Sequence, residues 1–350
     1  MIIRSKRKAD HIRIAARLPD GPCTAGFEDV YLVNDSVPEI NIDHIDTSAG
    51  FLSKTLNYPL IINAITGGTE NARRINRSLA KLARQYGLAM AVGSQTMAIH
   101  EPVLRDTFSV VRKENPDGLI LANVSALSPV EQALEAVEMV KADGLQLHFN
   151  IPQELAMPEG DRDFAGMLEN VARLVENSPV PIIAKEVGFG FSQEAARRLC
   201  GVGINYFDVG GKGGTNFVAI EDRREGWFVH EFDEWGIPTA VSLGELLALE
   251  YPITLIATGG IRTALDGVKA LAVGASLIGM AGPLLKILVN EGEAVLQRYL
   301  QGFLYRLKAG LLMTGSRNIG ELQQKPVIIL GKTAQWLTIR GIDVKRWAAR

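Results

Sequence analysis

The chain has 350 residues, of which 47% are hydrophobic and 22% are charged, as in a globular protein with a large core. Its formal net charge of −2 argues against a nucleic-acid binder, so any anionic partner must be met by local positive charge. The two cysteines, Cys23 and Cys200, are too few for a disulfide framework and lack the spacing of a metal site.

The start of the chain lacks the continuous apolar core of a signal peptide. The longest apolar stretch, residues 270–285, is interrupted by glycines and by Pro283, so it is too short and too broken to span a membrane. We therefore expect a soluble cytoplasmic protein with no membrane partner.

Residues 1–55 precede the main fold, and their first part is basic. Arg7, Lys8 and His11 lie in a basic segment with weak helical spacing that ends at Pro19. Charge runs of this kind are commonly the solvated face of a helix. The other interpretation is an arm that reaches over a phosphate-bearing ligand.

From residue 59 onward, short apolar runs alternate with helical segments. Eight such runs occur, at residues 60–65, 89–93, 119–123, 145–149, 181–185, 206–210, 254–258 and 277–281. Apolar strands that alternate with amphipathic helices indicate a parallel sheet buried on both faces. Eight units favour a (β/α)8 TIM barrel. A doubly wound sheet would show Gly-x-Gly-x-x-Gly after its first strand, where this chain has Ala64-Ile-Thr-Gly-Gly-Thr69.

The whole chain is expected to form one α/β domain. The barrel covers residues 56–316, the extension 1–55 packs on it, and the tail 317–350 forms a helical cap or a subunit contact. Two helix starts carry local signals, since Ser242 with Glu245 and Thr263 with Asp266 both have the spacing of a capping box.

The chemistry of a TIM barrel lies on the loops that follow its strands. The loops after the fourth and sixth strands are the longest, and long loops in compact domains are often functional. The first of them offers His148, Asn150, Gln153 and Glu154 within seven residues. We expect this cluster to face the ligand.

Glycines follow the last two strands, at Gly259-Gly260 and at Gly282. In TIM barrels a phosphate is often held at this place by backbone N–H groups and a helix N-terminus, and glycine permits the close approach. The simpler interpretation is a pair of tight turns.

Polar residues at the ends of other strands indicate which phosphate-bearing ligand is bound. Thr66, Ser94, Asn123 and Lys185 resemble the lining of a flavin mononucleotide (FMN) site, in which Lys185 would stabilise the reduced, anionic flavin. The alternative for Lys185 is a salt bridge with Glu186 or another acid.

Two better-known barrel families do not fit. Flavin 2-hydroxy-acid oxidases need a histidine base in loops that correspond to residues 210–215 and 258–262, and neither loop contains one. Inosine-monophosphate dehydrogenases need a cysteine after the sixth strand, where this chain has none.

Five stretches together resemble the type 2 isopentenyl-diphosphate isomerases, the FMN-dependent class, over almost the whole chain. They are Arg7-Lys8 with His11, Asn63–Gly68, Val92–Gln95, His148–Arg162, and Lys185–Gly190 with Gly210–Phe217. The run Met157-Pro-Glu-Gly-Asp-Arg162 is the most specific of them. One departure is Ile65, where the family often has a methionine.

The resemblance implies three sets of site residues. Flavin contacts fall at Ala64, Ile65, Thr66, Ser94, Asn123, Lys185, Thr215, Gly259, Gly260, Arg262, Ala281 and Gly282. Substrate contacts fall at Arg7, Lys8, His11, His148, Asn150 and Gln153, and a Mg²⁺ ligand falls at Glu154. Mg²⁺ is usually held by one or two carboxylates plus substrate phosphates, which suits Glu154 with a diphosphate. By itself, Glu154 would be read as a surface carboxylate.

The implied reaction is a reversible 1,3-allylic proton shift between isopentenyl and dimethylallyl diphosphate, in isoprenoid biosynthesis. Protonating an unactivated alkene needs a strong acid, and the strand ends offer neither an adjacent cysteine nor an evident carboxylate pair. The resemblance gives the acid–base role to reduced FMN, with NAD(P)H as the reductant. His148, Gln153 and Glu221 are the candidate catalytic side chains. Gln153, as a neutral amide, suits orientation of the substrate or a water.

Two other classes of function stay open. A flavin-dependent RNA-modifying barrel shares the fold but requires an extended basic face. A barrel that binds flavin or a phosphosugar without catalysis would keep the glycine loops and could dispense with Glu154 and Arg7-Lys8. The family resemblance also implies a homo-oligomer, a tetramer or an octamer.

Overall fold

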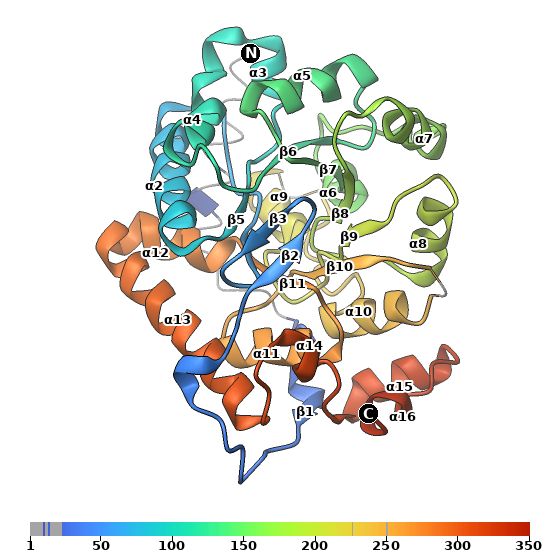
Figure 1. Cartoon of the computed structure of the whole chain (residues 1–350). Coiled ribbons are helices and arrows are strands. Elements are labelled where there is room, and N and C mark those ends of the chain that lie inside the picture. Colours follow the sequence, from blue (N-terminus) through green and yellow to red (C-terminus); the bar gives the residue numbers. More distant parts are fainter. Residues whose placement is uncertain (1–9, 11–12, 15–22, 226, 250) are drawn as a thin grey trace.

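Eight parallel strands close into a barrel in this computed structural model, which describes residues 10, 13–14, 23–225, 227–249 and 251–350 (Figure 1). The strands are β4 (Leu60–Ile62), β5 (Ala89–Ala91), β6 (Ile120–Ser125), β7 (Gly144–Phe149), β8 (Ile182–Glu186), β9 (Tyr206–Asp208), β10 (Thr254–Ala257) and β11 (Leu277–Met280). Each overlaps one of the eight predicted runs, and β11 pairs with β4 to close the ring. The TIM-barrel prediction is confirmed.

Helices surround the ring (Figure 1). The outer layer consists of α2 (Glu70–Tyr86), α4 (Asp106–Glu114), α5 (Val130–Val140), α7 (Met167–Asn177), α8 (Gln193–Cys200), α10 (Thr239–Leu247), α11 (Ala264–Val273) and α13 (Glu293–Met313). A further helix follows every second strand: α3 (Thr96–His100), α6 (Ile151–Ala156), α9 (Phe217–Glu225) and α12 (Gly282–Glu291). The two loops that the sequence marked as long are those that hold α6 and α9.

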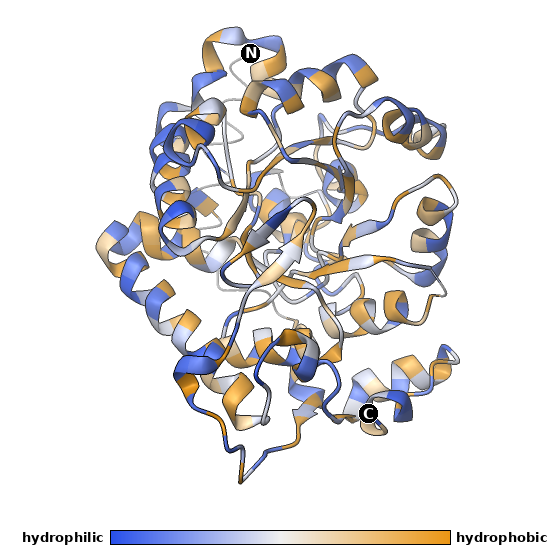
Figure 2. Cartoon of the chain, in the orientation of Figure 1, coloured by the Kyte–Doolittle hydropathy of each residue, from blue (hydrophilic) through white to orange (hydrophobic). Residues whose placement is uncertain are grey.

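The outer helices are amphipathic, and α2 shows how the sequence produces this. Its apolar residues recur at helical spacing and bury Ile75, Leu79 and Leu82 against the barrel. The helix starts where the Thr69 side chain accepts a hydrogen bond from Ala72 N, and it ends at Gly87 with a left-handed φ of 65°. Figure 2 shows the same alternation of hydrophilic and hydrophobic residues around the ring.

The barrel interior is apolar toward the N-terminal ends of its strands. Inward side chains such as Ile61, Leu121 and Ile256 form one cluster with Phe51 and Leu56. The last two belong to an antiparallel hairpin, β2 (Ala49–Phe51) with β3 (Lys54–Leu56), which crosses the centre of the ring in Figure 1. The hairpin therefore closes this end of the barrel.

Toward the C-terminal ends of the strands, the interior becomes polar. Asn63, Gln146 and Asp208 are all buried there. Side chains alternate along a strand, so in β7 the apolar Leu145 and Leu147 pack outward while Gln146 lies inside. The polar end of the barrel is thus set by single residues within apolar runs.

One of the two helix-start predictions is confirmed and the other is wrong. Thr263 and Asp266 form a complete capping box at α11. Ser242, in contrast, lies inside α10, which starts earlier because Pro238 at its N-cap supplies a fixed φ. The Ser242 hydroxyl donates to Phe191 O over 2.7 Å instead, and the buried Glu245 accepts from Gln193 N over 2.9 Å.

Segments from opposite ends of the sequence pair with each other. Strand β1 (Val30–Leu32) runs antiparallel to β12 (Val327–Ile329), and Asp29 accepts from Thr333 N over 2.8 Å. Among the residues that the structure describes from 23 onward, the other elements are the short helices η1 (Phe27–Asp29), η2 (Ile42–His44), η3 (Pro102–Leu104), α14 (Ile319–Leu322), α15 (Gly331–Ile339) and α16 (Lys345–Ala348). Among the described residues, no helix combines the length and apolar character needed to cross a membrane.

The C-terminal tail is predicted to contribute strongly to stability. Trp347 in α16 is 0% exposed and its indole N–H donates to Val273 O over 2.8 Å. Trp347→Ala should lower the free energy of unfolding by about 3–5 kcal/mol, because a large buried side chain leaves a cavity. Ile339→Ala, at a residue 85% exposed in α15, is the control and should change it by less than about 0.5 kcal/mol. Urea unfolding measures both, and equal effects would contradict the assignment.

Candidate active site

Strand register brings the predicted polar residues together at the C-terminal end of the barrel. His148 on β7 lies beside Ser125 of β6 and Lys185 of β8, and Lys185 lies beside Asp208 of β9. Four successive strands thus present their polar residues at one level. This is the end of the barrel at which TIM-barrel enzymes hold their substrates.

A buried ion pair lies at the centre of this level. Lys185 Nζ is 2.9 Å from Asp208 Oδ2, and the side chains are 11% and 0% exposed. Asp208 also accepts hydrogen bonds from Asn63 Nδ2 over 2.6 Å and from the Thr258 hydroxyl. The salt bridge considered for Lys185 is therefore present, with Asp208 as its partner rather than Glu186. A flavin contact at Lys185 stays a prediction.

Helix α6 gathers the polar cluster that follows β7. Asn150 is its N-cap residue and donates through Nδ2 to Glu154 Oε1 over 2.8 Å. Gln153 is buried and donates through Nε2 to Glu221 Oε1 on α9 over 2.9 Å. The sequence singled out all four residues, and the structure brings them into one hydrogen-bonded group. Arg224 of α9, which the sequence did not indicate, forms an ion pair with Glu221.

The Met157–Arg162 segment folds back over α6 and holds Glu154. Asp161 N donates to Glu154 Oε2 over 3.0 Å, while Arg162 donates to the carbonyl oxygens of Glu154 and Met157. Gly160 must be glycine, because a Cβ there would lie 2.0 Å from Glu154 O. This run, the most specific part of the family resemblance, therefore positions the half-buried Glu154 carboxylate.

The glycine-containing loops after β9, β10 and β11 lie so close together that the glycines of one loop approach atoms of the next. A Cβ on Gly214 would lie 2.7 Å from Gly260 N, and one on Gly259 would lie 2.0 Å from Gly211 O. A Cβ on Gly282, at the start of α12, would lie 3.1 Å from Thr215 Oγ1. The predicted flavin residues of these three loops are thus adjacent, around the N-terminus of a ten-residue helix.

The other predicted flavin residues lie on the same end of the barrel. Thr66 is buried, and Gly93 N donates to its carbonyl over 3.2 Å, which joins the loops after β4 and β5. The Ser94 hydroxyl lies 3.1 Å from Thr96 Oγ1, and Arg262 donates to Gly213 O. Ala64, Ile65 and Ala281 are half-buried on loops that follow strands. The predicted substrate residues Arg7, Lys8 and His11 lie outside the described residues.

A second group of potential metal ligands lies in the second half of α9 and in the segment that follows it. Asp222, His230 and Asp233 bring ligand atoms within 4.8 Å of one another. Both oxygens of Asp222 already accept backbone N–H groups, from Phe228 over 2.7 Å and from His230 over 2.9 Å. These contacts close the loop, so Glu154 is the better candidate for a metal that a diphosphate would complete.

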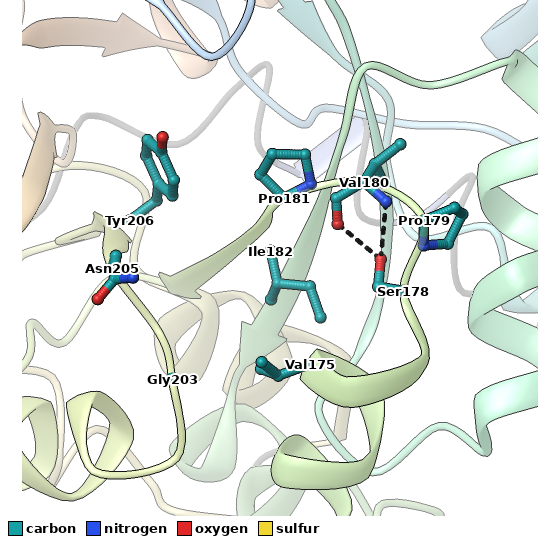
Figure 3. A pocket seen from close by; sticks show the side chains of 9 residues that line it. All are labelled: Val175, Ser178, Pro179, Val180, Pro181, Ile182, Gly203, Asn205 and Tyr206. Carbon is teal, nitrogen blue, oxygen red and sulfur yellow. Dashed lines mark hydrogen bonds between the residues drawn. The ribbon is translucent and has the colours of Figure 1, made fainter.

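A cavity of about 370 Å³ lies at the opposite end of the barrel (Figure 3). It is lined mainly by residues just before β8 and β9 or at the start of these strands, among them Pro181, Asn205 and Tyr206. The Ser178 hydroxyl is hydrogen-bonded to both backbone groups of Val180 there. In TIM barrels this end contributes to stability rather than to chemistry, so we do not assign the site to it.

Comparison with known proteins identifies the relatives of the chain. Residues 154–329 match the family model described as FMN-dependent dehydrogenase. The isopentenyl-diphosphate delta-isomerase of Symbiobacterium thermophilum is 48% identical over 100% of this chain and 99% of its own. That of Moorella thermoacetica is 48% identical over 95% and 96%, and that of Staphylococcus aureus is 43% identical over 98% of each.

Solved structures with a similar fold include two oxidases. A lactate oxidase of Pediococcus acidilactici has a TM-score of 0.70 with 14% identity over 94% of each chain. A mandelate oxidase with an FMN adduct has a TM-score of 0.65 with 16% identity over 92% of each. At this identity the likeness concerns the fold alone.

The buried Glu186, at the end of β8, gives the site region a pH-dependent stability. Burial raises the pKa of its carboxyl to about 8, against the hydrogen bonds that Oε2 accepts from Phe189 N and Gly190 N. The folded state thus favours the neutral acid. The stability contributed by this group is complete below its ordinary pKa of 4.5 and is lost as the pH rises to about 8.

Glu186→Gln should remove this dependence. The glutamine oxygen can accept from the same two N–H groups, and its amide nitrogen replaces the acid hydroxyl. Between pH 5 and pH 8 the unchanged protein should lose up to about 1.4 kcal/mol per pH unit relative to the variant. Urea unfolding of both proteins across this range is the measurement. Parallel profiles would show that Glu186 is ionised in the folded protein.

Proposed function

The chain belongs to the isopentenyl-diphosphate delta-isomerases of the FMN-dependent type 2 class, and on that basis we propose a mechanism for its reaction. Reduced FMN is the acid–base cofactor, Mg²⁺ at Glu154 holds the diphosphate, and NAD(P)H keeps the flavin reduced. The observation that carries this proposal is the hydrogen-bonded group of Asn150, Gln153, Glu154 and Glu221 at the barrel mouth that also holds the glycine loops.

The residues present fit an FMN molecule. Its phosphate suits the N-terminus of α12, beside which the glycines after β9 and β10 pack backbone against backbone, because the first N–H groups of a helix have no intrahelical partner. Lys185 suits the pyrimidine end of the flavin ring, because its positive charge is held in place by Asp208. When bound, reduced FMN supplies the proton-transfer group that the side chains of this site lack.

Glu154 suits a Mg²⁺ ion that a diphosphate completes. Each oxygen of its carboxylate accepts one hydrogen bond, from Asn150 and from Asp161 N, and each has a second lone pair. These contacts fix the carboxylate before the metal binds. A Mg²⁺ ion bound here would be held by Glu154 together with the substrate phosphates. Arg7, Lys8 and His11 are proposed to meet the remaining negative charge of the diphosphate.

The allylic shift requires a proton to be added to the terminal CH₂ of the alkene and another to be removed from C2, with no net electron transfer. Gln153 can orient the alkene or a water, because its own amide is fixed by Glu221 and Asn150. Glu221 forms an ion pair with Arg224, and its oxygens can accept a hydrogen bond or a proton relayed through Gln153 or a water. His148 is proposed to contact the diphosphate side.

The family membership also supports a cytoplasmic homo-oligomer of four or eight subunits. Large apolar side chains are exposed on the outer helices, including Tyr305 on α13 and Leu265 on α11. Contiguous exposed apolar surface is typical of subunit contacts.

Activity should depend on the reduced flavin. The purified protein, reduced under nitrogen and given isopentenyl diphosphate with Mg²⁺, should form dimethylallyl diphosphate, and the oxidised protein should form almost none. Product is measured by NMR of the reaction mixture. Full activity without any reductant would contradict the role of the flavin, and a protein that binds no flavin would contradict the cofactor itself.

Glu154→Gln should abolish Mg²⁺-dependent turnover while the protein keeps its flavin spectrum. The expected loss in kcat/KM is at least about 100-fold, because a neutral amide replaces the anionic ligand. Asp161→Asn is the matched control, since it neutralises an exposed acid of the same loop and keeps the backbone N–H that holds Glu154. Equal losses in both variants would mean that general loop charge, rather than Glu154, binds the metal.

A further inference from the structure

A continuous chain of buried hydrogen bonds runs from the central ion pair to His148. Gln146 Nε2 lies 3.4 Å from Asp208 Oδ2 and 3.0 Å from Asn63 Oδ1. Asn123 Nδ2 lies 3.1 Å from Gln146 Oε1, and His148 Nδ1 lies 2.8 Å from Asn123 Oδ1. Except for His148, which is half-buried, all of these side chains are buried.

The donors and acceptors in this series of hydrogen bonds are fixed at its start, by Asp208 and by Asn63. The Asp208 carboxylate, paired with Lys185, only accepts hydrogen bonds, so the Gln146 atom that faces it must be the NH₂ group. Asn63 Oδ1 accepts from Ala64 N over 2.8 Å, and a backbone N–H can only donate. Asn63 therefore also presents an acceptor to Gln146. Both neighbours require the same orientation of the Gln146 amide.

The orientation passes along the chain to the imidazole. With its NH₂ turned to Asp208 and Asn63, Gln146 presents its oxygen to Asn123, which must then donate through Nδ2. That leaves Asn123 Oδ1 facing His148 Nδ1. An acceptor at this distance requires a proton on Nδ1. Turning the Asn123 amide around would bring two oxygens together at Gln146 and leave buried groups without partners, which is costly.

We propose that Gln146, oriented by Asp208 and Asn63, acts as a positioning residue that fixes the proton of the His148 imidazole on Nδ1. In the neutral ring the lone pair is then on Nε2, so one defined tautomer faces the site. The importance of this for catalysis rests on the proposed function, in which His148 contacts the substrate. The tautomer itself does not depend on which substrate binds.

The direct test is the ¹⁵N spectrum of protein labelled only at histidine, recorded at alkaline pH where a histidine ring is neutral. The chain has five histidines, and the signal of His148 is assigned by its loss in His148→Gln. In the unchanged protein Nδ1 should carry the proton. A signal for unprotonated Nδ1 would overturn the proposal without the need for any variant.

Three variants then separate orientation from general packing. Gln146→Met keeps the side-chain volume but removes the hydrogen bonds that link Asp208 to Asn123, so His148 should show both tautomers. Gln146→Glu should keep a single tautomer, because a proton shared with Asp208 lets the new carboxyl donate to Asp208 and accept from Asn123. Gln95→Met is the control: Gln95 is buried beside Asn123, and its side chain is hydrogen-bonded to the backbone N–H of Asn123 and to α5 rather than to the Asn123 amide. It should also keep a single tautomer.

Kinetics provide a second readout of the same variants. An ionised phosphate oxygen only accepts hydrogen bonds, so His148 would donate to the diphosphate through Nε2 with both ring nitrogens protonated and with Nδ1–H bonded to Asn123 Oδ1. Loss of the fixed acceptor at Nδ1 in Gln146→Met disfavours this form, so kcat/KM should fall about twofold or more, and Gln146→Glu should restore it. A single Nδ1–H tautomer in Gln146→Met would overturn the proposal. A protein that shows the predicted tautomers but no isomerase activity would contradict the proposed function instead, so the two failures are distinguishable.

Discussion

The site depends on one carboxylate at the barrel axis. Asp208 is buried and accepts hydrogen bonds or an ion pair from Lys185, Asn63, Gln146 and Thr258, which come from or directly follow β8, β4, β7 and β10. An unpaired charge at this depth would be strongly unfavourable, so these partners must stay in place for the barrel to close around it. The same contacts hold the ammonium of Lys185 and orient the amides that reach His148. The same contacts of Asp208 therefore both hold the strands of the barrel together and arrange the polar side chains at its C-terminal end.

Two kinds of loop complete the site above the buried polar group around Asp208. The loops after β9, β10 and β11 are glycine-rich and pack backbone against backbone, an arrangement suited to a phosphate. The loop after β7 is built around charged and amide side chains, with Arg162 and Asp161 N fixing Glu154. The fold is shared with lactate and mandelate oxidases. Residues 210–215 and 258–262 contain no histidine, and the loop after β7 carries Glu154, the proposed metal ligand. The different chemistry thus follows from loops on a similar barrel.

Much of this could be predicted from the sequence because the relevant signals are local. Eight apolar runs predicted the strands, and their ends pointed to His148, Gln153 and Glu154. Asp208 was missed because it is a single acid inside an apolar run, and its partner Lys185 lies 23 residues away. The pairing of β1 with β12 joins segments about 300 residues apart, which no local pattern indicates. Ser242 gave a false helix start because Pro238, four residues earlier, already begins α10.

The central claim is that this barrel moves a double bond by proton transfer with a flavin that is not consumed. The most direct test follows the absorbance of the reduced protein during turnover in D₂O under nitrogen, with product sampled in parallel. We expect many molecules of dimethylallyl diphosphate per flavin, deuterium in the new methyl group, and a flavin spectrum that stays reduced. Oxidation of one flavin for each product formed, or product without deuterium, would contradict the account.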